Sequence, residues 1–197
     1  MNTHSAQSHS EFSQSAHRKE HTGNDVRIVI ENRGKIKTVV GSIDIDQPPE
    51  KIWPIVANPF EFQQTIYPRM KRIELMRDEP DRTLMKVSVD CGILPQITYV
   101  VECKYIRNQR VIFNRVDGIP KYFTGYWQIE PLDDGARSRV TYSLFVDPGI
   151  AVPQWLVREA LKVELPKTLR ALRHRVNDVY AGRDLALKRS ILAARTI

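Results

Sequence analysis

The sequence has no long apolar run and no apolar leader. No stretch of its 197 residues approaches the roughly 18 apolar residues that are needed to cross a bilayer. The first 25 residues are polar and lack the apolar core of a secretory signal. We therefore expect a cytoplasmic protein without a transmembrane helix.

Cysteine and histidine are scarce where chemistry would need them. Cys91 and Cys103 are the two cysteines and have no CxxC spacing, so we expect buried reduced thiols in place of disulfides or a zinc site. Outside the first 25 residues the one histidine is His174, and a Ser-His or Cys-His pair cannot be assembled around it. No glycine-rich phosphate loop is present either. We expect no metal and no cofactor, and catalytic residues stay unknown.

Basic residues exceed acidic ones, giving a net charge of +7. They are scattered and accompany no nucleic-acid recognition motif, so we expect no nucleic-acid partner. They are enriched only in the last segment, 183–197, where leucine and isoleucine alternate with lysine and arginine. This basic helical tail packs on its own domain or on a partner, or it makes a weak peripheral contact with anionic lipid. Nothing in the sequence indicates an oligomeric state.

The N-terminal part divides into a leader, a hairpin and two short helices. Residues 1–25 contain one large apolar group, Phe12, and we expect a disordered leader. Two β-rich runs flank Asn32-Arg33-Gly34, which predicts a hairpin whose first run adds an edge strand. The stretch "DQPPEKIW" turns from strand to helix, because proline cannot donate to a sheet but suits a first helical turn. Helices are predicted over 48–57 and 60–66.

A series of strands and one long helix complete the chain. The connections between successive strands are too short for crossover helices, so the sheet must be antiparallel. The predicted strands are 71–78, 82–92, 97–106, 110–116, 121–130 and 138–146. Apolar residues then recur at i+3 or i+4, which predicts an amphipathic helix of about 28 residues. Pro166 should bend this helix and Gly182 should end it.

This order of elements predicts an α+β fold in which a curved antiparallel sheet is covered by the long helix. The chain resembles the START-like (SRPBCC) superfamily, and within it the polyketide cyclase/coenzyme Q-binding branch. The resemblance covers roughly residues 35–180 and rests on "IDIDQPPEKIWPIV", "GYWQIEPLDDGARSRVTYSLFVDPG" and "VPQWLVREALKVELPKTLRALRHRV". It implies a helix-grip domain, placed at residues 26–182, with seven strands gripping the C-terminal helix around an apolar cavity.

The strands are rich in aromatic residues, which suits a pocket for a hydrophobic ligand. Charged Asp90, Arg115 and Asp117 point into this cavity or, by strand alternation, to solvent. Gly125 shares a face with Trp127, and we hypothesise that it leaves room for a ligand, not for the long helix. The candidate ligand-binding residues are Tyr99, Phe113, Arg115, Phe123, Gly125, Trp127, Tyr142, Leu165 and Leu169.

Three functions fit these features. The first is a carrier or chaperone that binds a lipid, quinone, isoprenoid or polyketide in the cavity. The second is a polyketide aromatase/cyclase that acts in the same pocket. A weaker third is an interaction module with an unused pocket. The lack of a convincing acid/base pair favours the first.

Overall fold

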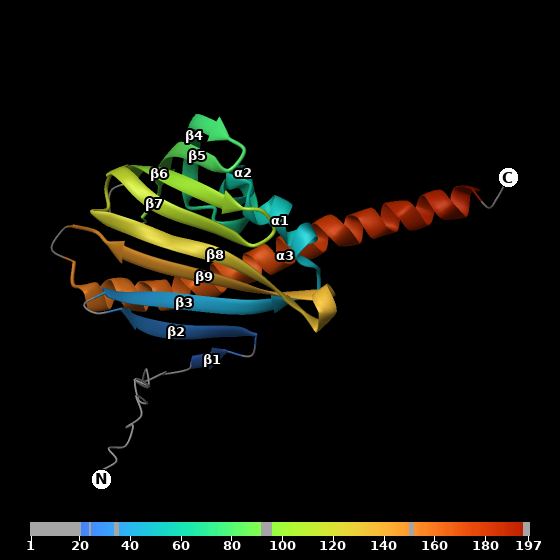
Figure 1. Cartoon of the computed structure of the whole chain (residues 1–197), viewed down its shortest axis with the longest axis horizontal. Coiled ribbons are helices and arrows are strands. Elements are labelled where there is room, and N and C mark those ends of the chain that lie inside the picture. The colour runs from blue at the N-terminus through green and yellow to red at the C-terminus, as the bar shows by residue number, and fades with distance from the viewer. Residues whose placement is uncertain (1–20, 24, 34–35, 92–95, 150–151, 195–197) are drawn as a thin grey trace, which may run out of the picture.

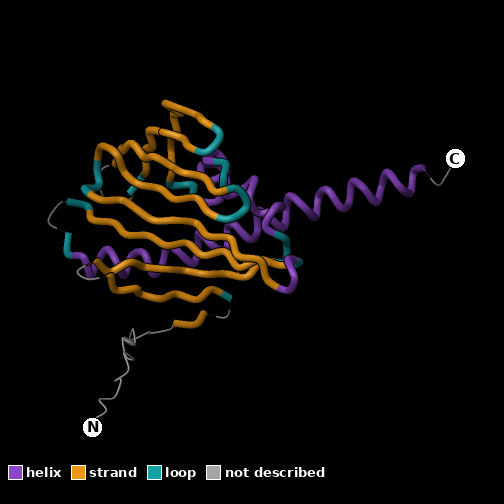
Figure 2. Tube along the Cα trace, viewed as in Figure 1, coloured by secondary structure: helices purple, strands orange, loops and turns teal. Residues whose placement is uncertain are grey.

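The computed structural model describes residues 21–23, 25–33, 36–91, 96–149 and 152–194. One antiparallel sheet curves over one long helix, which lies on its concave face (Figure 1). The observed architecture is the expected α+β helix-grip fold. The helix and the strands are drawn by type in Figure 2.

Within the described residues the sheet has nine strands, two more than the seven that the resemblance implied. Their order is β1-β2-β3-β9-β8-β7-β6-β5-β4, and every neighbouring pair is antiparallel, as the short connections predicted. The sheet is unclosed, since β1 and β4 are its two edges. The strands are β1 (His21–Gly23), β2 (Val26–Arg33), β3 (Ile36–Ile45), β4 (Met70–Glu79), β5 (Arg82–Val89), β6 (Ile97–Ile106), β7 (Arg110–Gly118), β8 (Tyr122–Leu132) and β9 (Arg137–Asp147).

The N-terminal boundary differs from the prediction. The hairpin of β2 and β3 is confirmed, but β2 is not the edge, because β1 pairs with it. Asp25 was placed in the disordered leader, yet its carboxylate accepts hydrogen bonds from Arg170 and Arg173 of the long helix. This double ion pair ties the chain to α3 just before Val26, and the domain bounds 26–182 stay a prediction. Residues 1–20 of the expected leader lie outside the described residues.

Two short helical segments follow β3, as predicted. They are α1 (Pro49–Val56) and a turn made of α2 (Pro59–Glu61) and the π-helical η1 (Phe62–Ile66). Pro48 is extended and Pro49 occupies the first turn of α1, which explains the abrupt change from strand to helix. The Asn58 side chain accepts a hydrogen bond from the Phe60 N–H at 3.1 Å and so caps α2. A short 3-10 turn, η2 (Asp133–Gly135), joins β8 to β9.

The long helix α3 (Gln154–Ala194) has the predicted inner face, with Leu165, Leu169, Leu172 and Val176 at most 1% exposed. The prediction that Gly182 ends the helix is wrong. A glycine inside a helix costs only about 1 kcal/mol relative to alanine, and the residues around it are good helix formers. The basic tail is therefore a continuation of α3, which projects beyond the sheet (Figure 1). Its side chains, 183–194, lie outside the described residues.

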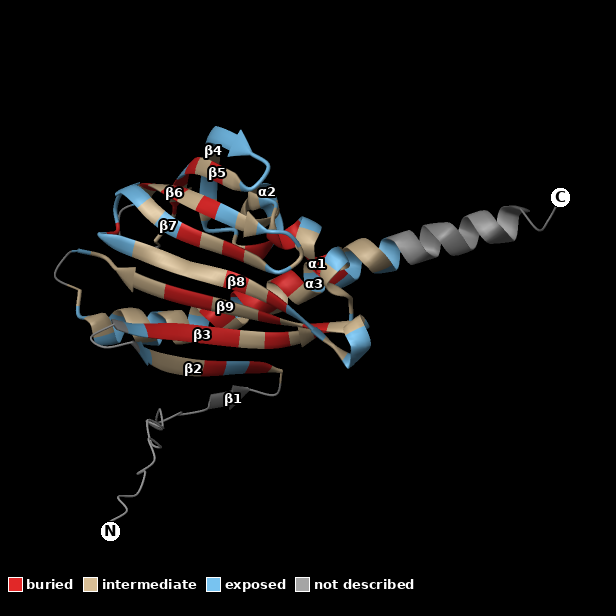
Figure 3. Ribbon diagram, viewed as in Figure 1, coloured by how far each residue is buried: buried red, intermediate tan, exposed pale blue. Residues whose placement is uncertain are grey.

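Buried residues form one cluster that runs across the sheet from β2 to β5 and includes the inner face of α3 (Figure 3). Gly41 of β3 permits the close approach of the helix here. A Cβ at this position would lie 2.8 Å from Leu169 Cδ1 and 3.0 Å from Ile28 Cδ1. Such distances are shorter than ordinary van der Waals contact, so the absent side chain lets Leu169 reach the strand. At Gly41 the helix is thus in direct contact with β3.

Candidate ligand-binding site

The other half of the sheet stands away from α3 and encloses a cavity of about 350 Å³. This volume lies within the usual range of small-molecule pockets. The walls come from the inner faces of β5 to β9, one side of α3, and the α1 to η1 segment. The aliphatic lining residues include Val56, Met85, Val87, Val89, Ile97, Val101, Val111, Leu144, Val146, Leu161 and Leu165.

A continuous row of aromatic rings forms one wall of the cavity. Tyr99 contacts Phe123, which contacts Phe113, with ring centroids 5.0 and 5.1 Å apart. The Phe113 ring lies 6.1 Å from that of Tyr142, which stacks on Trp127 at 3.9 Å and an interplanar angle of 5°. The rings come from four adjacent strands, β6 to β9, because alternation sends these positions to the same inner face. Rings that hold one another in this way form a stiff apolar wall.

Gly125 belongs to this wall but does not leave space for a ligand. A Cβ there would lie 2.0 Å from the Ser143 carbonyl oxygen and 2.6 Å from Phe113 Cζ. The space beside Gly125 is thus already filled by the neighbouring backbone and by the Phe113 ring. The hypothesis that Gly125 makes room for a ligand is wrong, and the helix does not fill that space either. The glycine instead allows the Phe113 ring to lie close to the backbone of β8.

The cavity contains tyrosine hydroxyls of two kinds. The Tyr105 hydroxyl is engaged by Thr83 Oγ1 at 2.8 Å. The hydroxyls of Tyr99 and Tyr142 have no hydrogen-bond partner among the described residues, although both rings line the cavity. In the described part of the chain, the one side-chain nitrogen or oxygen that is both buried and unpaired is Arg110 Nε, outside this site. The Tyr99 and Tyr142 hydroxyls therefore face the open volume.

The cavity keeps these hydroxyls protonated. Burial raises the pKa of Tyr99 and Tyr142 well above the usual tyrosine value, because a phenolate would lose its hydration. Burial likewise raises the pKa of the Cys103 thiol to about 12. A protonated phenol can donate a hydrogen bond to an acceptor on a ligand. The site thus offers donors inside an apolar space, and its tyrosines and Cys103 cannot serve as bases near neutral pH.

Charged residues lie at one end of the cavity, which marks its mouth. Arg69 is exposed, and the side chains of Asp90 and Glu164 are 46% and 30% exposed. Behind them, burial and then the charge of Glu164 raise the pKa of Tyr67. Lys71 lies 3.9 Å from Asp90, and Lys167 lies 3.1 Å from Glu164. The mouth is polar and the interior is apolar.

The structure brings six of the nine candidate residues to the cavity lining: Tyr99, Phe113, Phe123, Trp127, Tyr142 and Leu165. Gly125 lies beneath Phe113, as described above. Arg115 is directed away, and its Nη1 donates to the Gly118 carbonyl at 3.0 Å near the surface. Leu169 is fully buried against Gly41 on the side without a cavity. Contact of the six lining residues with a ligand stays a prediction.

The sequence reasoning did not select several lining residues. Phe62, Tyr67, Met85 and Tyr105 line the cavity. For Met85 and Tyr105 a signal existed, since alternation along β5 and β6 puts them on the same face as Val87 and Tyr99. Three charged residues were expected to point either into the cavity or to solvent. Of these, Asp90 lies at the mouth, whereas Asp117 is exposed and its carboxylate accepts a hydrogen bond from the Gly118 N–H.

The family model described as "Polyketide cyclase / dehydrase and lipid transport" matches residues 37–177. The chain belongs to this family. The match spans β3 to most of α3 and includes every strand that lines the cavity. The family is a hydrophobic-ligand-binding fold. No curated protein matches the sequence.

Solved structures share the fold at low sequence identity. A STAR-related lipid transfer protein from Xanthomonas axonopodis is 17% identical, with a TM-score of 0.67, over 81% of this chain and 98% of that one. Human STARD10 is 12% identical, with a TM-score of 0.71, over 90% of this chain and 80% of that one. The Zhui aromatase/cyclase from Streptomyces sp. R1128 is 13% identical, with a TM-score of 0.62, over 72% and 94%. Both lipid transfer proteins and a cyclase are thus similar in fold.

The described residues lack a membrane-spanning helix and a candidate metal cluster. None of the helices there is both long and apolar enough to cross a membrane. No group of three or more histidine, cysteine, aspartate or glutamate side chains in the same residues could hold a metal ion. His174 is exposed on α3 and is not among the lining residues.

Proposed function

We propose that this protein binds a hydrophobic small molecule in its cavity and acts as a carrier or chaperone for it. A lipid, quinone, isoprenoid or polyketide fits this role. The observation that carries the proposal is a pair of tyrosine hydroxyls, on Tyr99 and Tyr142, that face an apolar cavity without a partner among the described residues. A ligand acceptor in the cavity would give each hydroxyl a hydrogen-bond partner.

The two hydroxyls also suggest what the ligand carries. A carbonyl oxygen accepts hydrogen bonds and has no proton that would oppose a phenol donor. One such bond contributes about 0.5–1.5 kcal/mol, or roughly two- to tenfold in affinity. The stacked pair of Trp127 and Tyr142 offers a flat surface for a planar ring beside the donor. A ring ketone or quinone with an apolar body combines both features.

Organic extraction of the purified protein, followed by mass spectrometry, tests the proposal directly. We expect a co-purifying apolar compound that contains a carbonyl or hydroxyl group. Equilibrium dialysis with 2-methyl-1,4-naphthoquinone then measures affinity, and 1,4-dimethylnaphthalene serves as a carbonyl-free partner of similar shape. Saturable binding of neither compound, together with an empty extract, would contradict the carrier function.

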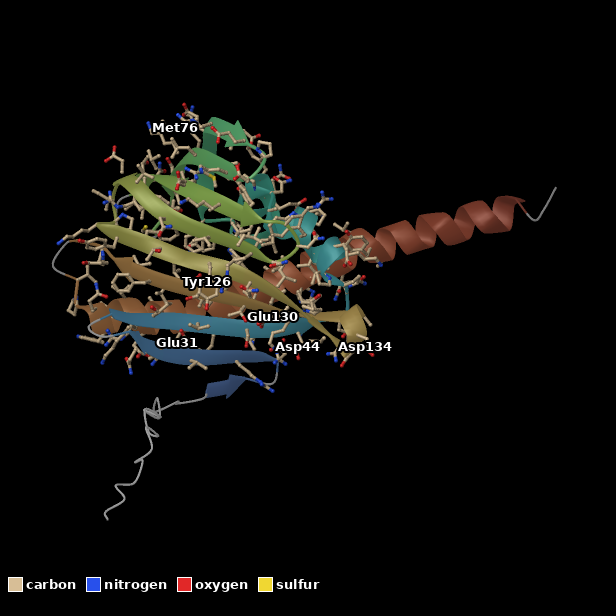
Figure 4. All side chains as sticks on the ribbon, in the orientation of Figure 1. Glu31, Asp44, Met76, Tyr126, Glu130 and Asp134 are labelled. Atoms are coloured by element: carbon tan, nitrogen blue, oxygen red, sulfur yellow. The ribbon has the colours of Figure 1, made fainter. Side chains whose placement is uncertain are left out.

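The variants Tyr99→Phe and Tyr142→Phe sharpen this test, because each removes one hydroxyl and keeps the ring. We expect each to weaken quinone binding roughly two- to tenfold and to leave binding of the hydrocarbon unchanged. Tyr126→Phe is the matched control, since Tyr126 lies on the outer face of the sheet (Figure 4). If both cavity variants still bind the quinone more tightly than the hydrocarbon by the wild-type ratio, the two hydroxyls do not bind the ligand carbonyl.

A polyketide aromatase/cyclase is the alternative proposal, and one feature favours it. Asp90 and Glu164 place carboxylates on the cavity lining near Tyr67, where a substrate proton could be taken up. Exchange of the α-protons of 1-tetralone into D₂O, followed by NMR, distinguishes the two functions. A carrier leaves the exchange at the buffer rate. A cyclase accelerates it, and Asp90→Asn or Glu164→Gln then abolishes the acceleration.

Three statements about the protein's surroundings stay predictions from the sequence. They are the cytoplasmic location, the binding of coenzyme Q in particular, and a weak peripheral contact of the basic segment 183–197 with lipid. Fractionation of cells that express the protein, with and without the segment, checks the first and the last.

A further inference from the structure

Exposed apolar side chains collect at the end of the sheet where the cavity opens. We call five of them the mouth patch: Ile119, Tyr122, Trp155, Leu156 and Val163. Each is 47–59% exposed, and Trp155 is the most exposed of them. Side chains of this size normally avoid water, and a cluster of them marks an interaction surface.

The patch comes from two segments that the fold brings to the same end. Tyr122 begins β8 and pairs with Asp147 at the end of β9, and α3 starts a few residues later. A Cβ at Gly149 would lie 2.7 Å from Lys121 Cβ, so the β7–β8 loop contacts the segment that leads into α3. Figure 1 shows that β8 begins and β9 ends at the same end of the sheet where α3 starts.

The patch borders the cavity mouth on both segments. Pro120 lines the cavity and lies between Ile119 and Tyr122 in the sequence. On α3, the exposed Ala160 also lines the cavity, and Leu156 and Val163 flank it at spacings of four and three residues. Residues at these helical spacings share one strip of surface. A ligand that enters between the two segments would therefore pass this patch.

Basic side chains interleave with the apolar ones. Lys121 lies within the loop, with its Nζ 5.5 Å from the Tyr122 ring centroid, and Arg158 follows Trp155 and Leu156 on α3. Neither makes an ion pair with a described carboxylate. Tryptophan, tyrosine and basic residues together are typical of protein surfaces that lie in the headgroup region of a bilayer. A second protein chain would be a poorer match, because lysine is depleted in protein interfaces.

We infer that the mouth patch docks the protein on an anionic lipid surface, with the cavity mouth facing the bilayer. Ile119, Trp155, Leu156 and Val163 enter the headgroup boundary, and Lys121 and Arg158 contact lipid phosphates. This contact differs from the one expected of the basic tail, which lies at the opposite end of α3. A docked protein could exchange an apolar ligand without exposing it to water.

Flotation with phosphatidylcholine vesicles, with and without 30% phosphatidylserine, tests the docking surface in the full-length protein. We expect binding that needs phosphatidylserine and falls as salt rises. The double variant Trp155→Ser with Val163→Ser should lower the partition coefficient at least tenfold. Its matched control is Met76→Ser with Ile106→Ser, because these side chains are similarly exposed, at 56% and 47%, and belong to β4 and to the end of β6. The control should bind like the wild type.

Three results would overturn the inference. The first is that wild-type protein stays with neither kind of vesicle. The second is that the control loses as much binding as the mouth variant. The third is that light scattering reveals a dimer which only the mouth variant dissociates, since the patch would then be covered by a second copy. Because the four substituted side chains are on the surface, we expect unchanged melting temperatures. Circular dichroism melts of all variants check that a loss of binding does not come from unfolding.

Discussion

Two halves of one sheet differ in how closely they pack against the helix α3. On β2, β3 and β9 the helix α3 packs closely, and Leu169 reaches the backbone at Gly41. On β5 to β8 the sheet stands away, and rings of Tyr99, Phe113, Phe123 and Trp127 line a cavity of about 350 Å³ with Tyr142 of β9. A glycine appears in each half for a different neighbour, the helix at Gly41 and an aromatic ring at Gly125. We call the halves the packed half and the hollow half.

The difference explains how a small domain can be stable although it contains a cavity. Close packing in one half supplies stability through fully buried Leu, Ile and Val side chains. In the hollow half, aromatic rings contact one another along the cavity wall. The α1 to η1 segment then covers the end, and Glu61 binds Arg175 of α3 through two hydrogen bonds of 2.7 and 3.0 Å.

The largest expected effect contrasts two leucines of α3. Leu172→Ala, in the packed half, should lower the free energy of unfolding by about 2–5 kcal/mol, because Leu172 is fully buried and its loss creates a cavity. Leu161→Ala, which faces the existing cavity, should cost about 1 kcal/mol. Urea unfolding of both variants provides the measurement. Equal costs would mean that the two halves do not differ in packing.

Gly125→Ala should be the next most costly change, at about 3 kcal/mol. The new Cβ would meet the Ser143 carbonyl oxygen at 2.0 Å, and the backbone of β9 cannot move without disturbing the sheet. The cost should persist in a Phe113→Leu background, which frees the ring but not the carbonyl. Thermal melts of the four proteins decide this. A cost that vanishes in that background would assign the restriction to the ring alone.

Gly41→Ala should cost less, about 1–2 kcal/mol, because its neighbours are the ends of flexible side chains. Ile28→Val removes one of these ends. In a double-mutant cycle we expect the pair to be less destabilised than the sum of the single variants, by about 0.5 kcal/mol or more. Strict additivity in urea unfolding would show that the helix does not press on this strand as described.

The smallest effect concerns the cover of the hollow half and depends on pH. Hydrogen bonds from Arg175 lower the pKa of Glu61 below its ordinary 4.5, although burial opposes them. The ion pair therefore stabilises the fold above pH 4.5, and the stability is lost as pH falls through the lowered pKa. Glu61→Gln should cost about 1 kcal/mol at pH 7 and less at pH 3.

The control for this change is Glu159→Gln, whose ion pair with Lys162 is a surface contact between residues three apart on α3. It should cost less than about 0.5 kcal/mol at either pH. Thermal melts at pH 7 and pH 3 check both variants. A Glu61→Gln deficit that grows as the pH falls would contradict the sign of the pKa shift.

Much of the fold could be predicted because local patterns decide it. Alternation identified the inner faces of the strands, and spacing identified the buried stripe that includes Leu172 and Val176. The prediction that the helix ends at Gly182 was wrong. A glycine inside a helix costs about 1 kcal/mol, which is too little to end a helix whose flanking residues are good helix formers. β1 was not predicted, because three residues are too few to show the alternation that indicates a strand.

The site was less predictable because it depends on contacts between distant residues. Six of nine candidates line the cavity, yet of two leucines one turn apart only Leu165 does so, although both lie beside Gly41. No sequence rule tells which of the two reaches the open space. Gly125 was predicted on the correct face of the sheet, but its predicted neighbour was a ligand. The Phe113 ring of the adjacent strand fills that space. Such differences arise from packing and not from periodicity.

Methyl NMR of the full-length protein, with isoleucine, leucine and valine labelled, tests the division into two halves most directly. Titration with 2-methyl-1,4-naphthoquinone should shift the methyl signals of Val87, Val101, Val111 and Leu144, which line the cavity. The signals of Val26, Val39, Leu172 and Val176, in the packed half, should stay in place. Saturable shifts confined to the first group are the predicted result. Shifts centred on the second group, or no saturable shift, would contradict the account.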